Sequence, residues 1–254
     1  MLIDTHVHLD DTRYAEDREA LISRASQAGV EVLVTIGTSM DDSRWAPPFA
    51  QGHKQVYAVV GSHPERVLEW KPGQMGEYEA LAREPKVVAI GEVGLDYHSE
   101  GFDKEAQAVC FRSMIQLGRK LKLPLVIHQR DAAEDTLRIL KEEGAGAEGG
   151  VFHCFAGTWE TAKAAMDLGF DIAVGGILTF PSARELREVI AKVPMQRLVL
   201  ETDGPWLAPQ EQRGKRNEPA YIKSVAAKLA EIKGLGFDKV EEATTANARR
   251  LFRI

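Results

Sequence analysis

Short apolar runs recur along the chain, and longer segments with helical spacing of apolar residues separate most of them. Strands that are apolar throughout and alternate with helices favour parallel pairing through crossover helices. Helical spacing and helix-forming residues mark Asp17–Ala28, Lys104–Lys120, Asp131–Glu143, Thr158–Leu168 and Ala183–Lys192. The eight candidate strands are Leu2–Thr5, Val30–Ile36, Val56–Val60, Val87–Ile90, Leu125–Ile127, Gly150–Phe152, Phe170–Val174 and Leu198–Leu200.

Eight strand–helix units within 254 residues match the usual size of an α/β barrel of the (β/α)8, or TIM, type. We predict one such domain over residues 1–254, because no repeat, low-complexity tract or linker marks a boundary. An open doubly wound sheet is the alternative, but no Gly-rich phosphate fingerprint follows the first strand. After the last strand we expect a polar loop, Pro205–Glu218, then helices over Pro219–Lys233 and up to Leu251.

Composition narrows the class of protein. The net charge of -6 argues against a globally basic nucleic-acid binder, although a small basic patch beside an active site is compatible with it. The chain has no long apolar run, and its start, MLIDTHVHLD, is unlike a signal peptide, so we expect a cytoplasmic protein without membrane contact. Cys110 and Cys154 lack the spacing of a zinc ribbon and are expected to be reduced thiols in the core. Composition does not define the oligomeric state, and a monomer is plausible.

Histidines and carboxylates gather where the candidate strands end. The C-terminal rim of such a barrel is where the active site is assembled, so these side chains are expected to converge and to bind a metal. Side chains two apart on a strand share a face, which lets the first two histidines reach one ion. The rim residues are His6, His8, His63, Glu92, His128, His153 and Asp203.

Each of these residues also has a structural interpretation. A lone His-x-His pair or a solitary histidine more often binds nothing, and only convergence on one rim favours a metal site. Glu92 lies between glycines, which leave room for it to bridge two cations, and Asp203 can serve as both ligand and base. Asp4 shares the parity of the histidine pair and is a candidate to orient an imidazole from behind. Glu201 either orients an imidazole in the same way or forms a structural salt bridge.

Motifs along the whole chain resemble those of the TatD family of metal-dependent hydrolases, in the amidohydrolase-like superfamily. Gly204 and Ser62 depart from the usual family residues, and neither is an expected ligand. The resemblance implies a (β/α)8 barrel with metal-dependent hydrolase activity of the deoxyribonuclease type. The matching segments are DTHVHLD (4–10), GSHP (61–64), GEVGLDY (91–97), PLVIH (124–128), FHCFAG (152–157), ETDGPWL (201–207) and RGKRNEP (213–219), with Asn247 and Leu251–Phe252 near the end.

The resemblance implies a binuclear centre of two divalent ions. One ion would be held by His6, His8, Glu92 and Asp203, and the second by Glu92, His128 and His153, so that Glu92 bridges. Two such ions lower the pKa of a shared water, and Asp203 would orient that water and accept its proton. The expected catalytic residues are thus Asp203 and Glu92. The imidazoles favour Zn²⁺ or Mn²⁺, whereas nuclease activity in the family is associated with Mg²⁺.

Substrate contacts are expected from the rim loops. His63 has no paired histidine, so we assign it to a substrate phosphate or leaving group. Arg66, Arg213 and Arg216 are expected to bind phosphate, while a solvated loop with acidic neighbours is an equally open interpretation of the last two.

Three functions are compatible with these residues. The favoured one, on the family resemblance, is a 3′-5′ exodeoxyribonuclease acting on single-stranded DNA ends. A hydrolase of another ester or amide, notably a D-aminoacyl-tRNA deacylase acting on a tRNA 3′ end, would use the same centre. A non-catalytic metal-binding accessory protein is disfavoured, because a binding module has no need of the base Asp203.

Overall fold

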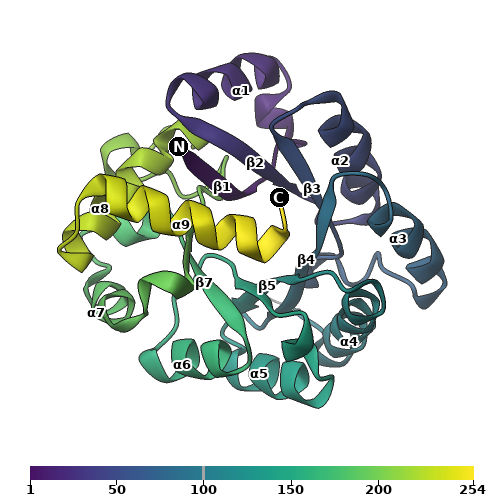
Figure 1. Cartoon of the computed structure of the whole chain (residues 1–254). Helices are drawn as coiled ribbons and strands as arrows, with labels where there is room; N and C mark the ends of the chain where they lie inside the picture. Colours follow the sequence, from purple (N-terminus) through teal and green to yellow (C-terminus); the bar gives the residue numbers. More distant parts are fainter. Residues whose placement is uncertain (99–100) are drawn as a thin grey trace. The chain divides into compact units, whose positions relative to one another are not determined.

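The computed structural model describes residues 1–98 and 101–254. Parallel strands alternate with helices, and the strand order of the sheet follows the chain from β1 to β8 (Figure 1). The predicted succession of eight strands is therefore confirmed. Two compact units are described separately below: unit 1 comprises Met1–Thr35, Cys154–Lys163 and Ile172–Ile254, and unit 2 comprises Ile36–His153 and Ala164–Asp171.

Unit 1 contains the first and the last strands of the chain. Its strands are β1 (Leu2–Val7), most of β2 (Val30–Ile36), most of β7 (Phe170–Val174) and β8 (Leu198–Leu200). β1 pairs with β2, and β7 with β8, in parallel. Just beyond β8, Gly204 bridges to Val7 of β1. The chain after β8 is thus fastened to the end of β1, where the histidine pair lies.

Helices cover the strands of unit 1. α9, yellow in Figure 1, packs on β1, β8 and α8. In α9, the hydroxyl of Thr245 donates a hydrogen bond to the carbonyl of Met1 at 2.7 Å. The carboxylate of Glu241 lies 3.0 Å from the terminal amine. The helices of this unit are α1 (Arg18–Gln27), most of α6 (Trp159–Asp167), α7 (Arg184–Lys192), α8 (Ile222–Lys233) and α9 (Phe237–Phe252).

Unit 2 contains four consecutive strands, paired in parallel from β3 to β6. Helices α2 to α5 pack against them in turn. Strand interiors such as Val59, Ala89, Ile90 and Ile127 are fully buried, as expected of a parallel sheet covered by helices. The strands are β3 (Val56–Val60), β4 (Val87–Asp96), β5 (Leu125–Arg130) and β6 (Gly150–Phe152), and the helices are α2 (Met40–Gly52), α3 (Met75–Ala82), α4 (Lys104–Leu121) and α5 (Ala133–Glu142).

Three strands extend further than the apolar runs predict. β1 continues to Val7, β4 to Asp96 and β5 to Arg130. The added residues include the polar side chains of the candidate site, which an apolar criterion excludes. The helices α2 and α3 were not among the segments named from the sequence. In α2, Pro47 and Pro48 lie inside the helix and lack the N–H that a helix interior uses.

Two further expectations concern the cysteines and membrane contact. Cys110 and Cys154 are not disulfide-bonded; the first is buried and the second half-buried, so Cys154 is less of a core residue than expected. Among the helices described for residues 1–98 and 101–254, we find none with the length and apolarity of a membrane span.

Candidate metal centre

The first cluster of donor atoms lies in unit 1 and consists of His6, His8 and Asp203. The two imidazole Nε2 atoms are 3.2 Å apart. The Oδ1 atom of Asp203 lies 3.4 Å from Nε2 of His8 and 3.8 Å from Nε2 of His6. Two ligands about 2.1 Å from a tetrahedral ion are roughly 3.4 Å apart. The donor set and its spacing therefore fit one divalent cation, which would bind all three side chains.

Main-chain hydrogen bonds fix the backbone segments that carry these three side chains. The amide of Asp203 donates to the carbonyl of His6 at 2.9 Å, and the amide of His8 donates to the carbonyl of Gly204 at 2.8 Å. Asp203 has a φ of 58°. A residue with a side chain adopts this left-handed region at a cost, and such cost is characteristic of functional positions. The backbone itself thus aims Asp203 at the histidine pair.

Asp4 supports the first cluster through hydrogen bonds to residues next to its ligands. Its side chain is fully buried and accepts hydrogen bonds from the amide of His6 (3.3 Å) and from the amide and hydroxyl of Thr202 (2.9 and 2.5 Å). Burial raises the pKa of Asp4 to about 7, although these hydrogen bonds oppose the shift. Asp4 therefore positions the backbone on either side of the cluster, through amides and a hydroxyl.

The turn that carries Asp203 is secured by a residue to which the sequence analysis gave no role. Asn217 is fully buried, and its Nδ2 donates to the carbonyls of Thr202 and Trp206 at 2.7 and 2.6 Å. Tyr14 donates its hydroxyl to the carbonyl of Asn217 at 2.5 Å. The sequence could have indicated this role, because Asn217 is an uncharged amide in the otherwise charged loop RGKRNEP, and buried amides usually bind the backbone.

The second cluster lies in unit 2 around one carboxylate oxygen, Oε1 of Glu92. It is 2.7 Å from Nδ1 of His128, 3.4 Å from Nε2 of His63 and 3.6 Å from Nε2 of His153. Glu92 is 3% exposed, so the carboxylate faces these imidazoles and little water. The chemistry of the set, one carboxylate with several imidazoles, again fits a divalent ion.

Two glycines of β4 make the second cluster possible. A Cβ at Gly91 would lie 2.6 Å from Cβ of Val126, and a Cβ at Gly94 would lie 1.9 Å from the carbonyl oxygen of His128. The φ of Gly94 is +147°, which side-chain-bearing residues rarely adopt. β4 therefore approaches β5 closely enough for Glu92 to reach His128.

Asp96 completes the second cluster and was missing from the predicted site. Its Oδ2 lies 2.9 Å from Nε2 of His128, on the opposite side of the ring from Glu92. Burial of His128 opposes its charge, but the two carboxylates outweigh burial and raise its pKa to about 9. Asp96 and Glu92 are four residues apart on one strand, so their side chains share a face. This spacing could have identified Asp96 from the sequence.

His63 lies with the candidate ligands of unit 2. Its Nε2 faces Glu92, and its Nδ1 accepts a hydrogen bond from the amide of Glu65 at 3.2 Å. Burial lowers the pKa of His63, and the neighbouring His128 lowers it further. His63 is thus a candidate ligand as well as the substrate contact that the sequence suggested.

Glu201, for which the sequence left open a histidine-orienting role or a structural salt bridge, lies in unit 1. It is 1% exposed, and its Oε1 accepts a hydrogen bond from the amide of Cys154 at 2.7 Å. This bond joins the end of β8 to the chain that follows β6.

The predicted phosphate-binding arginines differ in their surroundings. Arg216 forms a bidentate ion pair with Asp17, at 2.7 and 2.8 Å, and also donates to the carbonyl of Arg13. Arg213 is exposed and lies over the ring of Phe180, 4.1 Å from its centre. Arg66 is exposed and pairs with Glu69 at 2.7 Å. Arg216 is therefore held in an ion pair, whereas Arg213 and Arg66 lie at the surface, and phosphate binding by all three stays a prediction.

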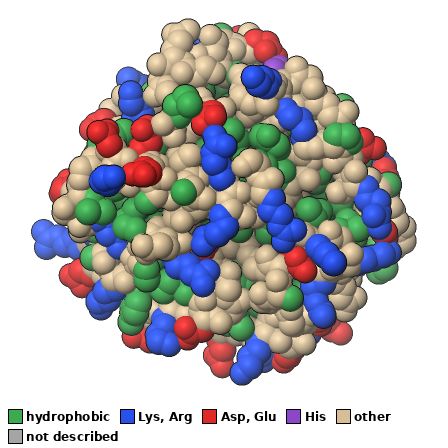
Figure 2. Space-filling model, in the orientation of Figure 1, with side chains coloured by type: hydrophobic (Ala, Val, Ile, Leu, Met, Phe, Trp, Pro, Cys, Tyr) green, Lys and Arg blue, Asp and Glu red, His purple; other side chains and the backbone are tan. Residues whose placement is uncertain are grey.

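The charged side chains on one face of the molecule are mixed. On the face seen in Figure 2, Lys and Arg side chains are spread out, and Asp and Glu side chains lie mostly towards its edges. The net charge of -6 argues against a globally basic nucleic-acid binder.

Buried imidazoles and carboxylates at the ends of parallel strands are the ligand set of metal-dependent hydrolases, and the comparisons assign this chain to that class. The chain belongs to the family of TatD-related DNases, whose model matches residues 3–253. It is 43% identical over 254 residues to YabD of Bacillus subtilis, named an uncharacterized metal-dependent hydrolase, with 100% of both chains covered. It is 35% identical over 259 residues to the 3′-5′ ssDNA/RNA exonuclease TatD of Erwinia tasmaniensis, again with 100% of both covered.

A solved structure gives the fold. The crystal structure of YJJV, a TatD homolog from Escherichia coli K12, matches with a TM-score of 0.94 at 32% identity and covers 100% of this chain and 98% of that one. The predicted (β/α)8 barrel is therefore confirmed, and so is the resemblance to the TatD family.

Proposed function

We propose that this metal-dependent hydrolase is a phosphodiesterase that shortens single-stranded DNA from its 3′ end. The observation that carries the proposal is the pair of donor clusters, each of which gathers imidazoles around a buried carboxylate. A relative of equal length, 35% identical, is named an exonuclease for single-stranded DNA and RNA. Phosphodiester hydrolysis is a reaction for which a pair of divalent ions is well suited.

Two ions are proposed, one for each cluster. His6, His8 and Asp203 would hold the first, and Glu92 and His128 the second, with His153 or His63 as a further ligand. When bound, divalent ions there would make water more acidic and stabilise negative charge on phosphoryl oxygens. The sharing of Glu92 between both ions stays a prediction from the family resemblance.

The chain's own residues then have distinct tasks. Asp203 holds its Oδ1 close to the histidine pair and accepts the proton that the attacking water loses. Main-chain bonds and Asp4 hold the backbone that carries this carboxylate, which limits how far its oxygen can move during the reaction. Arg66 and Arg213 lie at the surface, where they can meet phosphates next to the one that is cleaved.

The test is direct. The purified protein receives a labelled single strand, the same strand blocked at its 3′ end, and D-tyrosyl-tRNA, each with Mg²⁺, Mn²⁺ or Zn²⁺. Stepwise shortening from the free 3′ end, abolished by a chelator, is expected. Intact strands together with rapid, chelator-sensitive release of D-tyrosine would replace the exonuclease proposal with a deacylase.

A further inference from the structure

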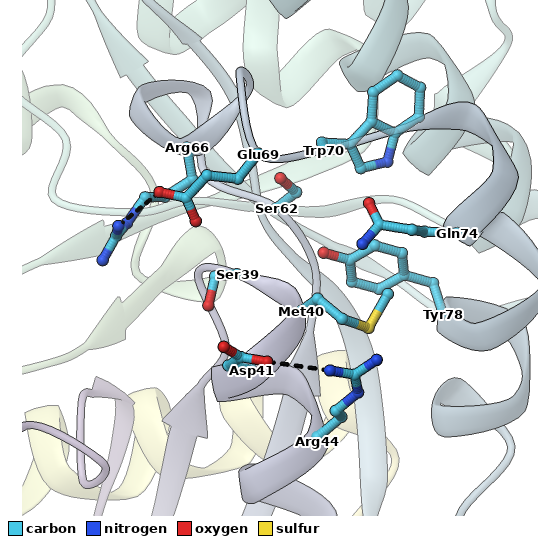
Figure 3. Close-up of a pocket in the computed structure, with 10 residues that line it drawn as sticks. All are labelled: Ser39, Met40, Asp41, Arg44, Ser62, Arg66, Glu69, Trp70, Gln74 and Tyr78. Atoms are coloured by element: carbon cyan, nitrogen blue, oxygen red, sulfur yellow. Dashed lines mark hydrogen bonds and ion pairs between the residues drawn. The ribbon is translucent and has the colours of Figure 1, made fainter.

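A cavity in unit 2 opens between the start of α2 and the loop before α3 (Figure 3). Its volume is about 180 Å³. Ser62 lines it, and the next residue, His63, reaches Glu92 in the cluster. Adjacent Cα atoms are about 3.8 Å apart, so the cavity and the cluster share one short stretch of backbone. The lining residues are Ser39, Met40, Asp41, Arg44, Ser62, Arg66, Glu69, Trp70, Gln74 and Tyr78.

The interior of the cavity is uncharged and suits a flat heteroaromatic ring. Met40, Ser62 and Tyr78 are buried, while Trp70 and Gln74 are half-buried and lie on the α3 side (Figure 3). Aromatic rings, a thioether, hydroxyls and an amide can together contact both the faces and the polar edges of such a ring. A phosphate inside this lining would meet no cation, so the interior selects for the uncharged part of a ligand.

Trp70 supplies a donor for that ligand. Its Nε1 is buried and makes no hydrogen bond within residues 1–98 and 101–254. A buried donor left in this state is unfavourable, and an acceptor on a bound molecule would remove this penalty. A nucleobase carries ring nitrogens and carbonyl oxygens that can accept this bond.

Charge is confined to the mouth. Arg44 pairs with Asp41 at 3.0 Å and with Glu77 at 2.6 Å, and Arg66 pairs with Glu69 at 2.7 Å. These residues are largely exposed, and such ion pairs contribute little, about 0–1 kcal/mol. An arginine here can exchange its carboxylate for a phosphate, which it binds in the same bidentate geometry.

We propose that this cavity binds a nucleobase of the substrate, namely the base of the nucleotide whose phosphate is cleaved. Trp70 donates to the base, and Arg66 or Arg44, at the mouth, contacts a phosphate next to the one that is cleaved. The inference rests on the proposed function, since it gives the phosphodiesterase a site for the terminal nucleotide. The aromatic side chain of an aminoacyl ester is the competing occupant.

Binding is tested without turnover, on the metal-replete full chain. Calorimetry compares thymidine 5′-monophosphate with 2-deoxyribose 5-phosphate, which lacks only the base. The first is expected to bind the more tightly. Trp70→Phe keeps an aromatic ring but removes the N–H, and it should weaken the nucleotide about 5-fold, as one hydrogen bond of about 1 kcal/mol implies, while leaving the sugar phosphate unchanged.

The matched control is Trp45→Phe. Trp45 lies on α2 in the same unit and stacks on Phe49 at 4.3 Å, but it does not line the cavity. The control should bind both ligands like the parent. Equal affinity of the parent for the two ligands, or the same loss in both variants, would overturn the proposal. Binding of D-tyrosine methyl ester without binding of the nucleotide would give the cavity to the competing occupant.

An activity arm separates this inference from the proposed function. A strand with a normal 3′ nucleotide is compared with one whose 3′ nucleotide lacks its base. The parent should show a higher KM for the abasic end, and Trp70→Phe should reduce the difference. If neither strand is cut but the nucleotide preference persists in calorimetry, the exonuclease fails and the base site stands. If both strands are cut with equal KM, the exonuclease stands and the base site fails.

Discussion

The two donor clusters reach similar chemistry by different routes. In the cluster of unit 1, backbone bonds and the buried Asp4 place Asp203 against the histidine pair. In the cluster of unit 2, one side-chain oxygen of Glu92 lies near three imidazoles, and a second carboxylate, Asp96, lies against His128. The first cluster is preorganised by the main chain, whereas the second depends on side-chain charges. The carboxylates of the two clusters should therefore respond differently to the same substitution.

The largest difference is expected between Glu92→Gln and Asp203→Asn. The amide at position 92 removes the charge that faces three imidazoles, so metal should be lost along with activity. We expect two ions per chain in the parent and fewer in Glu92→Gln, measured by elemental analysis after dialysis against each metal. A parent that holds no more than one ion with every metal in excess contradicts the two-ion proposal.

Asp203→Asn should lose its turnover even when excess metal keeps both clusters filled. Asparagine tolerates the left-handed backbone that Asp203 adopts, so the turn should fold as before. An amide cannot accept the water's proton, and a general base contributes about 10²–10⁴-fold, so kcat should fall by that factor with little change in KM. Steady-state kinetics on a 3′-labelled strand provide the measurement. Near-parental kcat with full metal content would remove Asp203 from the role of base.

The supporting carboxylates offer a matched and smaller test. Asp4→Asn keeps an oxygen that can accept from the backbone amides but removes the carboxylate next to the first cluster. Asp96→Asn likewise removes the carboxylate that contacts His128. Outer-shell partners of metal ligands are typically worth about 10–100-fold in metal affinity or activity. We expect Asp96→Asn to lower metal affinity more, because it acts on a side chain, while Asp4→Asn should mainly lower the melting temperature. Metal titration and thermal unfolding of both variants check this order, and the reverse order would contradict the contrast between the clusters.

Much of this could be predicted from the sequence, for identifiable reasons. Strands such as Val30–Ile36 and Val56–Val60 have the expected bounds, because apolar runs end where turns begin. The histidines and Glu92 follow strands, so their gathering within each unit was predictable from topology. Asp96 was missed because it lies at the polar end of a strand that the apolar run cut short. Arg216 could not be separated from its neighbours, since its partner Asp17 is 199 residues away in the sequence.

The smallest expected effect comes from that ion pair, which lies outside both clusters. Hydrogen bonding to Arg216 is the main cause that lowers the pKa of Asp17 to about 2, with Arg24 adding to it. A carboxylate whose folded-state pKa is lowered stabilises the fold above its ordinary pKa of about 4, and the benefit disappears as the pH falls towards 2. Asp17 is 32% exposed, so screening limits the effect, and Asp17→Asn should lose about 1 kcal/mol at most near pH 7. Urea unfolding at pH 7 and pH 2.5 measures the difference in unfolding free energy between parent and variant, which should shrink at the lower pH.

Exonuclease activity of Asp17→Asn at pH 7 should change by less than about two-fold if the ion pair only stabilises the fold. A loss of activity as large as that of Asp203→Asn, with stability intact, would instead return Arg216 to the substrate-binding role that the sequence suggested.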